Sequence, residues 1–301
     1  MSLPAMTQPP GPAALRADKE ARLAAHYDHC GALLHAHDRD RWLGALFAPE
    51  RSRKHLHALY AFALEIARIR ENVRDPAPGE IRMQWWIDAI EGETRGDVGA
   101  HPVANALIDT IFTFQLPRAA FTDLIEARRF DLYDDPFPDV EALETYCGHT
   151  SSLLFRLATI ILSDGREPGG ADAAGYAGVA YALTGLMRAF PFHAAQGRLY
   201  LPADVLAAHG VATGAAIVRP ASPGLLDALA EIRALSRRRL DQAAEALPHV
   251  APPARAAFAP LAVAPLYLKA MEQGGYHPFS TDVTVAQWRR QWAMWRFMRK
   301  F

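Results

Sequence analysis

The chain has 301 residues, half of them apolar and 22% charged, which is the composition of a folded globular protein and excludes a disordered one. Its 32 basic and 33 acidic residues give a formal net charge of −1, so no overall field recruits nucleic acid, and we expect no nucleic-acid partner. Two cysteines, Cys30 and Cys147, are too few for a disulfide framework and favour a reducing, cytoplasmic setting.

The first 20 residues contain several prolines and no apolar run long enough for a secretory signal. We predict a disordered tail over residues 1–20 and one domain over residues 21–301. The absence of a targeting presequence suits a bacterial protein. The longest strongly apolar run, residues 153–162, is far shorter than the ~20 residues that span a bilayer.

Helical spacing of apolar residues dominates the rest of the chain, for example over 107–112, 153–161 and 229–247, and no sustained strand-like alternation occurs. Proline and glycine clusters separate these segments, at 74–80, 134–139, 164–170, 219–224 and 249–253. The pattern predicts a single all-α domain of about ten helices joined by short loops.

Histidines early in the chain do not form a metal-site pattern. His26, His29 and Cys30 share a helical face, but His35 and His37 point to other faces, and paired ligand groups are missing. We interpret this segment as a solvated amphipathic helix and expect no metal site, there or at His55 and His57.

The C-terminal segment 284–301, TVAQWRRQWAMWRFMRKF, places Trp288, Trp292 and Trp295 one or two turns apart. Arg289 and Arg296 lie among them, and no acidic residue follows Asp282. A basic helix with an aromatic stripe is typical of contact with an anionic membrane surface. Alternatively the tryptophans dock this helix onto the core, and both interpretations can hold for different faces.

Three segments carry a family resemblance, RKHLHALYAFALEIARIRE (53–71), DLYDDPFPDVEALETYC (131–147) and ALTGLMRAFPFHAAQGRLYLP (182–202). In this order and spacing they resemble the squalene and phytoene synthase family. The resemblance implies an isoprenoid-synthase-type helical bundle around a central cavity. In active members, two Asp-x-x-x-Asp motifs on facing helices hold magnesium ions, which hold the diphosphates of two prenyl chains.

Both aspartate motifs are degenerate in this chain. The first has Ala67, Arg68 and Glu71 at its acidic positions, and the second has Ala189 and His193. Magnesium takes oxygen ligands, which carboxylates one helical turn apart would supply together. We therefore expect no catalytic residue and no cofactor, with Mg²⁺ only if the chain is an active transferase.

Some cavity residues of the family are retained. The resemblance assigns Tyr60, Arg188, Arg198 and Tyr200 to a candidate pocket for an anionic ligand, although the arginines could equally form buried structural ion pairs. We expect Glu71 to pair with an arginine, in the first place Arg188, so that Glu71→Gln lowers thermal stability. The alternative is a solvated ion-pair stripe of Glu65, Arg68 and Glu71.

Phe155 stands where the family has a glycine beside the cavity, which predicts a narrowed pocket. His193 follows Pro191, and it could simply cap or fill a kinked helix.

The closer similarity is to the branch that contains the mitochondrial complex I assembly factor with a phytoene-synthase-like domain. It rests on GEIRMQWW (79–86), TSSLLF (150–155) and LMRAFPFHAAQGRLYLP (186–202). It implies a non-catalytic role in assembling the respiratory NADH dehydrogenase, with complex I subunits or assembly intermediates as partners. Two alternatives stay open, a head-to-head prenyl transferase and a protein that binds an isoprenoid or another lipid. We expect a cytoplasmic protein, peripheral at the inner face of the membrane.

Overall fold

The computed structural model describes residues 11–94 and 97–300. Residues 1–10 of the predicted tail lie outside the described residues. The tail prediction was wrong for residues 12–20, because helix α1 begins at Pro12 and runs to His37. Proline is compatible with the first helical turn, and an Arg16 to Glu20 pair one turn apart supports the helix there.

All regular structure in the described residues is helical, as predicted. The first half contains α1 (Pro12–His37), α2 (Arg39–Ala45), α3 (Glu50–Ala67), α4 (Pro76–Glu91), α5 (Pro102–Phe114), α6 (Arg118–Arg128) and α7 (Val140–Cys147). The second half contains α8 (Leu153–Leu162), α9 (Ala171–Arg188), α10 (Phe190–Ala195), α11 (Ala203–Ala208), α12 (Pro223–Ala246), α13 (Ala264–Met271) and α14 (Gln287–Met298).

Short 3₁₀ segments connect these helices, and two of them matter for the site. These two are η1 (Arg70–Asn72) and η3 (Arg129–Leu132). A longer 3₁₀ segment, η7 (Pro252–Val263), runs through the core. Between α7 and α8 the chain makes a π-helical turn, η4 (Gly148–Ser152). Wide turns of this kind often occur at functional sites.

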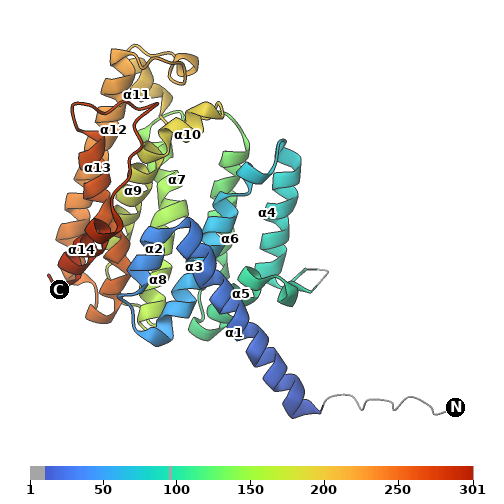
Figure 1. Cartoon of the computed structure of the whole chain (residues 1–301). Helices are drawn as coiled ribbons and strands as arrows, with labels where there is room; N and C mark the ends of the chain where they lie inside the picture. The colour runs from blue at the N-terminus through green and yellow to red at the C-terminus, as the bar shows by residue number, and fades with distance from the viewer. Residues whose placement is uncertain (1–10, 95–96, 301) are drawn as a thin grey trace.

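The helices form a bundle in which α9 packs along α12, and α1 packs against α3 and α5 (Figure 1). Two groups of buried apolar side chains make up the core, one centred on α3, α5 and α8 and the other on α9, α12 and α13. Tyr181 and Trp42 contact both groups and join them.

One close crossing depends on a glycine. A Cβ atom on Gly178 of α9 would lie 2.1 Å from the Cα of Ser152 in the π-helical turn, which is a severe overlap. The absence of a side chain at Gly178 therefore lets α9 lie directly against η4, and this contact fixes one wall of the candidate site.

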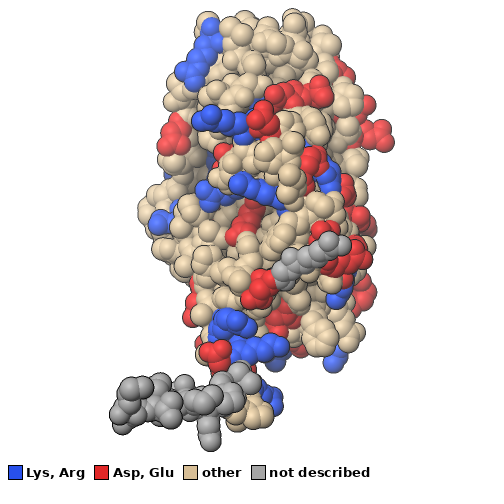
Figure 2. Space-filling view, turned by 90° about the vertical axis from the view of Figure 1, so that its right-hand side faces the viewer, with Lys and Arg blue, Asp and Glu red and all other residues tan. Residues whose placement is uncertain are grey.

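The surface seen on the α4 side carries basic and acidic side chains close together (Figure 2). This mixture gives that face no single-sign field. No helix in the described part of the chain is long and apolar enough to cross a bilayer.

Candidate functional site

A cavity of about 220 Å³ lies where the two degenerate motifs approach each other. Helix α3 and the residues after it contribute Ala67 and Glu71, and α9 contributes Tyr181 and Gly185 from the opposite side. Helix α9 also contributes Ala182 and Leu186. The remaining walls come from α2, the α6–η3 and α7–η4 regions, α10 and the loop after it, through Arg41, Arg128, Asp131, Tyr146, Thr150, Ser151, His193, Arg198 and Tyr200.

Glu71 lies at the rim of this cavity and pairs with Arg68. The Glu71 Oε2 to Arg68 Nε distance is 3.5 Å, and both side chains are 37% exposed. The predicted ion pair between Glu71 and Arg188 is therefore wrong. Helix α3 ends at Ala67, and the tight η1 turn brings Glu71 back over Arg68 rather than across the cavity.

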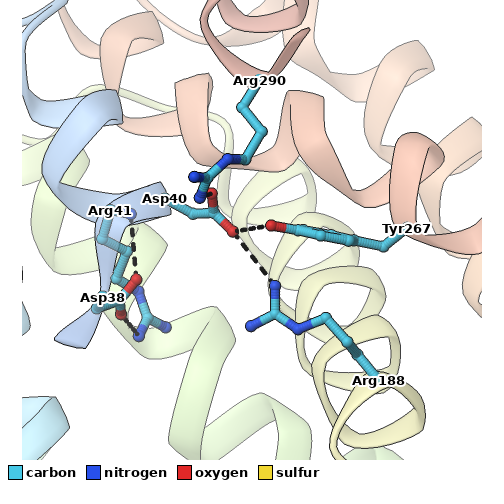
Figure 3. A network of polar contacts seen from close by, with 6 residues as sticks. All are labelled: Asp38, Asp40, Arg41, Arg188, Tyr267 and Arg290. Atoms are coloured by element: carbon cyan, nitrogen blue, oxygen red, sulfur yellow. Dashed lines mark hydrogen bonds and ion pairs between the residues drawn. The ribbon is translucent and has the colours of Figure 1, made fainter. Parts of the chain in front are cut away.

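Arg188 faces a different group of residues, centred on Asp40 of α2 (Figure 3). Its Nη1 lies 3.5 Å from Asp40 Oδ2, and its guanidinium lies over the Tyr267 ring at 4.4 Å. Asp40 is buried and also accepts hydrogen bonds from Tyr267 (2.7 Å) and Arg290 (2.8 Å). Of the two alternatives for Arg188, the geometry favours the structural ion pair.

Asp131 is the buried carboxylate of the cavity, and no sequence pattern singled it out. Its Oδ1 accepts hydrogen bonds from Tyr146 (2.7 Å) and Tyr200 (2.9 Å), and its Oδ2 accepts one from Arg128 (2.9 Å). Burial, together with the Asp131 charge, raises the pKa of Tyr200, so its hydroxyl stays a donor. In the sequence, Asp131 stands out only as the first residue of the family-like segment 131–147, and no motif there marks it as a cavity residue.

Arg198 and His193 lie beside this carboxylate network. Arg198 is 7% exposed, and no carboxylate of the described residues lies within ion-pair distance of its guanidinium. His193 stacks obliquely on Tyr200 with ring centroids 4.6 Å apart. Burial, and then the Arg198 charge, lowers the pKa of His193 to about 4, so this imidazole is neutral at pH 7. The cavity therefore holds a buried cation that forms no ion pair with a carboxylate of the described residues.

Tyr60 lies behind the cavity rather than on its surface. It is buried, and the guanidinium of Arg41 lies 5.5 Å from its ring centroid and 5.2 Å from that of Tyr181. Arg41 also forms a 3.0 Å ion pair with Asp38 (Figure 3). The structure thus brings Arg198, Tyr200 and His193 together, and it separates Tyr60 and Arg188 from them.

Phe155 fills space in the core next to the cavity. It stacks on Phe258 with ring centroids 5.6 Å apart and meets Tyr181 edge-on at 5.9 Å. The ring is buried, so the residue that replaces the family's glycine occupies interior volume between α8, α9 and η7.

Of the five residues at the acidic positions of the motifs, only Glu71 has a carboxylate. Ala67 and Ala189 have no ligand atom, Arg68 is a cation, and His193 offers a nitrogen where this metal prefers oxygen. Asp131 already accepts three hydrogen bonds. Within the described residues no three histidine, cysteine or acidic side chains are grouped to hold a metal ion. His55 instead lies buried against Tyr27 and Thr110.

A second hollow of about 450 Å³ lies on another face of α3, towards α4. Glu65 and Arg68 line it together with Arg82, Trp85 and His101. Burial raises the pKa of Glu65 to about 7, although Arg68 acts in the opposite direction. His101 Nε2 lies 3.5 Å from the Glu65 carboxylate.

Comparison with known proteins agrees with this architecture. The model of the squalene/phytoene synthase family matches residues 34–296. The chain belongs to the squalene/phytoene synthase family. A dehydrosqualene synthase structure superimposes with a TM-score of 0.78 at 20% identity, covering 94% of this chain and 98% of that one. A squalene synthase from Alicyclobacillus acidocaldarius gives 0.71 at 24% identity, covering 86% and 97%.

Curated relatives within this family include complex I assembly factors and phytoene synthases. The NADH dehydrogenase (ubiquinone) complex I, assembly factor 6 of Bos taurus is 32% identical over 61% of this chain and 55% of its own length. The Homo sapiens protein of that name is 29% identical over 72% and 65%. A 15-cis-phytoene synthase from Synechocystis is 26% identical over 60% and 56%. The alignments thus span little more than half to two-thirds of these relatives.

Proposed function

We propose that this protein is a non-catalytic member of its family that acts in the assembly of the respiratory NADH dehydrogenase, complex I. The names of the bovine and human relatives support the assembly role. The observation that carries the non-catalytic part is the chemistry of the motif positions. Metal-assisted departure of a diphosphate requires oxygen ligands that neutralise developing charge, and Ala67, Arg68, Ala189 and His193 cannot supply them.

The proposed partners are subunits or assembly intermediates of this enzyme, met at the inner face of the membrane. The one acidic residue left at a motif position, Glu71, supports the same proposal, because it already pairs with Arg68 at the rim. A metal bound there would have to displace a cation of the protein itself and would find no second carboxylate from α9.

An enzymatic assay tests the non-catalytic part. Purified protein supplied with farnesyl or geranylgeranyl diphosphate and magnesium should release no more diphosphate than a heat-treated control. A phytoene synthase assayed in parallel shows that the assay works. Magnesium-dependent formation of squalene or phytoene would overturn the proposal.

A genetic experiment tests the assembly role. Cells that lack the protein should contain less assembled NADH dehydrogenase on native gels, and the wild-type chain should restore it. Glu71→Gln should restore it equally well, because the proposal assigns no metal to Glu71. Normal assembly in the deletion strain would contradict the role, whereas rescue by wild type but not by Glu71→Gln would point to retained chemistry.

A second candidate function, binding of an anionic isoprenoid or lipid without turnover, is favoured by one observation. Arg198 is a buried cation at the cavity surface, and no carboxylate of the described residues forms an ion pair with it. A buried unpaired charge costs several kcal/mol, so a phosphate or diphosphate group that pairs with it would be stabilised. The neutral Tyr200 hydroxyl and His193 ring lie beside it.

Calorimetric titration tests this candidate. Titrating farnesyl diphosphate, farnesol and inorganic diphosphate in turn separates the contribution of the diphosphate group to binding from that of the prenyl tail. Arg198→Met should weaken binding of both diphosphates by about tenfold or more, the amount expected for a charge-assisted contact. The exposed Arg238→Met serves as the control, and equal binding by all three proteins would exclude Arg198 as the anion ligand.

A further inference from the structure

The C-terminal helix α14 is docked on the protein by one face and exposes its tryptophans on another. Met294 is fully buried, Arg290 reaches inward to Asp40, and the helix packs against η7 and α2. Trp288, Trp292 and Trp295 are 68%, 55% and 40% exposed. The interpretation that the tryptophans dock this helix is therefore wrong, because other residues perform that task.

The exposed residues are arranged in two adjacent ridges. At about 100° per residue, Trp288, Trp292 and Trp295 fall within about 60° of one another around the helix. Arg289, Arg296 and Lys300 follow about 90° further round, and all three are exposed. Arg290, Met294 and Phe297, which face the protein, occupy the other side. The apolar and basic ridges thus both remain outside.

The three tryptophans lie on one side of α14, and two of their indole rings are in contact. Trp292 and Trp295 stack with ring centroids 4.8 Å apart, and the Arg299 guanidinium lies 4.7 Å from the Trp295 ring centroid. Each exposed indole leaves apolar area in contact with water, which is unfavourable. Scattered exposed apolar residues are ordinary, whereas a row of three tryptophans on one helix marks an interaction surface.

The chemistry beside the tryptophans identifies the occupant. No acidic residue occurs between 283 and 300. The basic ridge lies directly beside the tryptophan ridge on the exposed side of the helix. Anionic lipid headgroups attract such cations, while indole rings with their N–H groups prefer the boundary between headgroups and acyl chains. Twelve helical residues are about 18 Å long, which is too short to span a bilayer but suited to lying in its surface.

We propose that the Trp288–Trp292–Trp295 ridge of α14 inserts into the headgroup region of an anionic membrane, with Arg289, Arg296 and Lys300 on the phosphates. The bundle then sits on the membrane as a peripheral protein held by a helix that is already folded. This inference rests on α14 alone and does not depend on the assembly role or on the content of the cavity.

Cosedimentation of the full-length protein with vesicles tests the proposal. Phosphatidylglycerol/phosphatidylcholine vesicles should bind the wild-type protein at low salt at least about tenfold more tightly than phosphatidylcholine vesicles, and high salt should reduce the difference. Deletion of α14 would be a poor variant, because it removes the buried Met294 and the Arg290 contact with Asp40.

Point substitutions on the exposed ridges leave those contacts in place. The triple variant Trp288→Gln, Trp292→Gln, Trp295→Gln should lose about tenfold or more in vesicle affinity and also the blue shift of tryptophan fluorescence on vesicle addition. Phe112→Gln removes an aromatic side chain that is 83% exposed on α5, away from these cations, and should bind like the wild type. Circular dichroism checks that all variants are folded.

The contribution of the α14 cations to vesicle binding is tested by a second variant with its own control. Arg289→Gln with Arg296→Gln should weaken binding to anionic vesicles by about tenfold or more. Arg166→Gln with Arg238→Gln removes two exposed cations elsewhere and should have little effect. Unchanged binding by the tryptophan variant would overturn the proposal. So would conversion of a wild-type dimer to a monomer by that variant, because the ridge would then cover a second copy of the chain.

Discussion

Arg290 donates a 2.8 Å hydrogen bond to Asp40, and this contact joins the last helix of the described chain to the second. The Asp40 side chain is 7% exposed and that of Arg290 13%, so the pair is largely shielded from water. Tyr267 and Arg188 reach the same carboxylate (Figure 3), so Asp40 connects α2, α9, α13 and α14. The orientation of α14 therefore depends on one buried charge.

Asp40→Asn should lower the free energy of unfolding by about 3 kcal/mol, because it leaves Arg290 and Arg188 close together without their counter-charge. Urea denaturation followed by circular dichroism measures the loss. Amide hydrogen exchange should show faster exchange in α14 than in α9. Asp282→Asn, at an exposed position near the start of the same segment, is the control. Wild-type stability of Asp40→Asn would show that the carboxylate does not hold these elements together.

The fold was predictable because its signals are local. Helical spacing and proline or glycine breaks occur within a few residues of one another, and the family motifs add their order along the chain. The partner of Arg188 was not predictable in this way, because Asp40 lies 148 residues away and no local pattern marks it. The same holds for two of the three donors to Asp131, because Tyr146 and Tyr200 lie 15 and 69 residues away from it. For α14 the sequence showed a tryptophan stripe and a set of cations, but it did not show which face of the helix packs against the bundle.

Asp131→Asn should destabilise the protein by about 3 kcal/mol or more. The change removes the charge that Arg128 pairs with and turns one acceptor into a donor facing the Tyr146 and Tyr200 hydroxyls. Tyr200→Phe alone should cost about 1 kcal/mol, and a double-mutant cycle should give a coupling above about 0.5 kcal/mol. Strict additivity in thermal or urea unfolding would mean that the two side chains act independently.

Glu71→Gln should change the free energy of unfolding by less than about 1 kcal/mol. Its ion pair with Arg68 is long, and each side chain is 37% exposed, so water screens most of the attraction. This replaces the expectation from the sequence that the substitution lowers thermal stability. A loss similar to that of Asp131→Asn would indicate that Glu71 pairs inside the cavity after all.

Replacing Glu65 by glutamine should change how stability depends on pH. Burial raises the folded-state pKa of Glu65 from 4.5 to about 7, so between these pH values the folded protein binds more protons than the unfolded chain. Stability therefore falls as the pH rises through this window, and Glu65→Gln removes that loss. The full shift corresponds to about 3 kcal/mol, which partial exposure of the side chain reduces to about 2.

Urea unfolding at pH 5 and pH 8 measures this effect as a difference between variant and wild type. That difference isolates Glu65 from the buried histidines, because burial lowers the pKa of His193 and of His55 to about 4 and makes both favour folding as the pH rises. Relative to the wild type, Glu65→Gln should gain stability on going from pH 5 to pH 8. Glu245→Gln, at an exposed position on α12, should show no such gain. If both variants behave alike, Glu65 is ionised well below pH 7 and the hollow beside α3 is more hydrated than its geometry indicates.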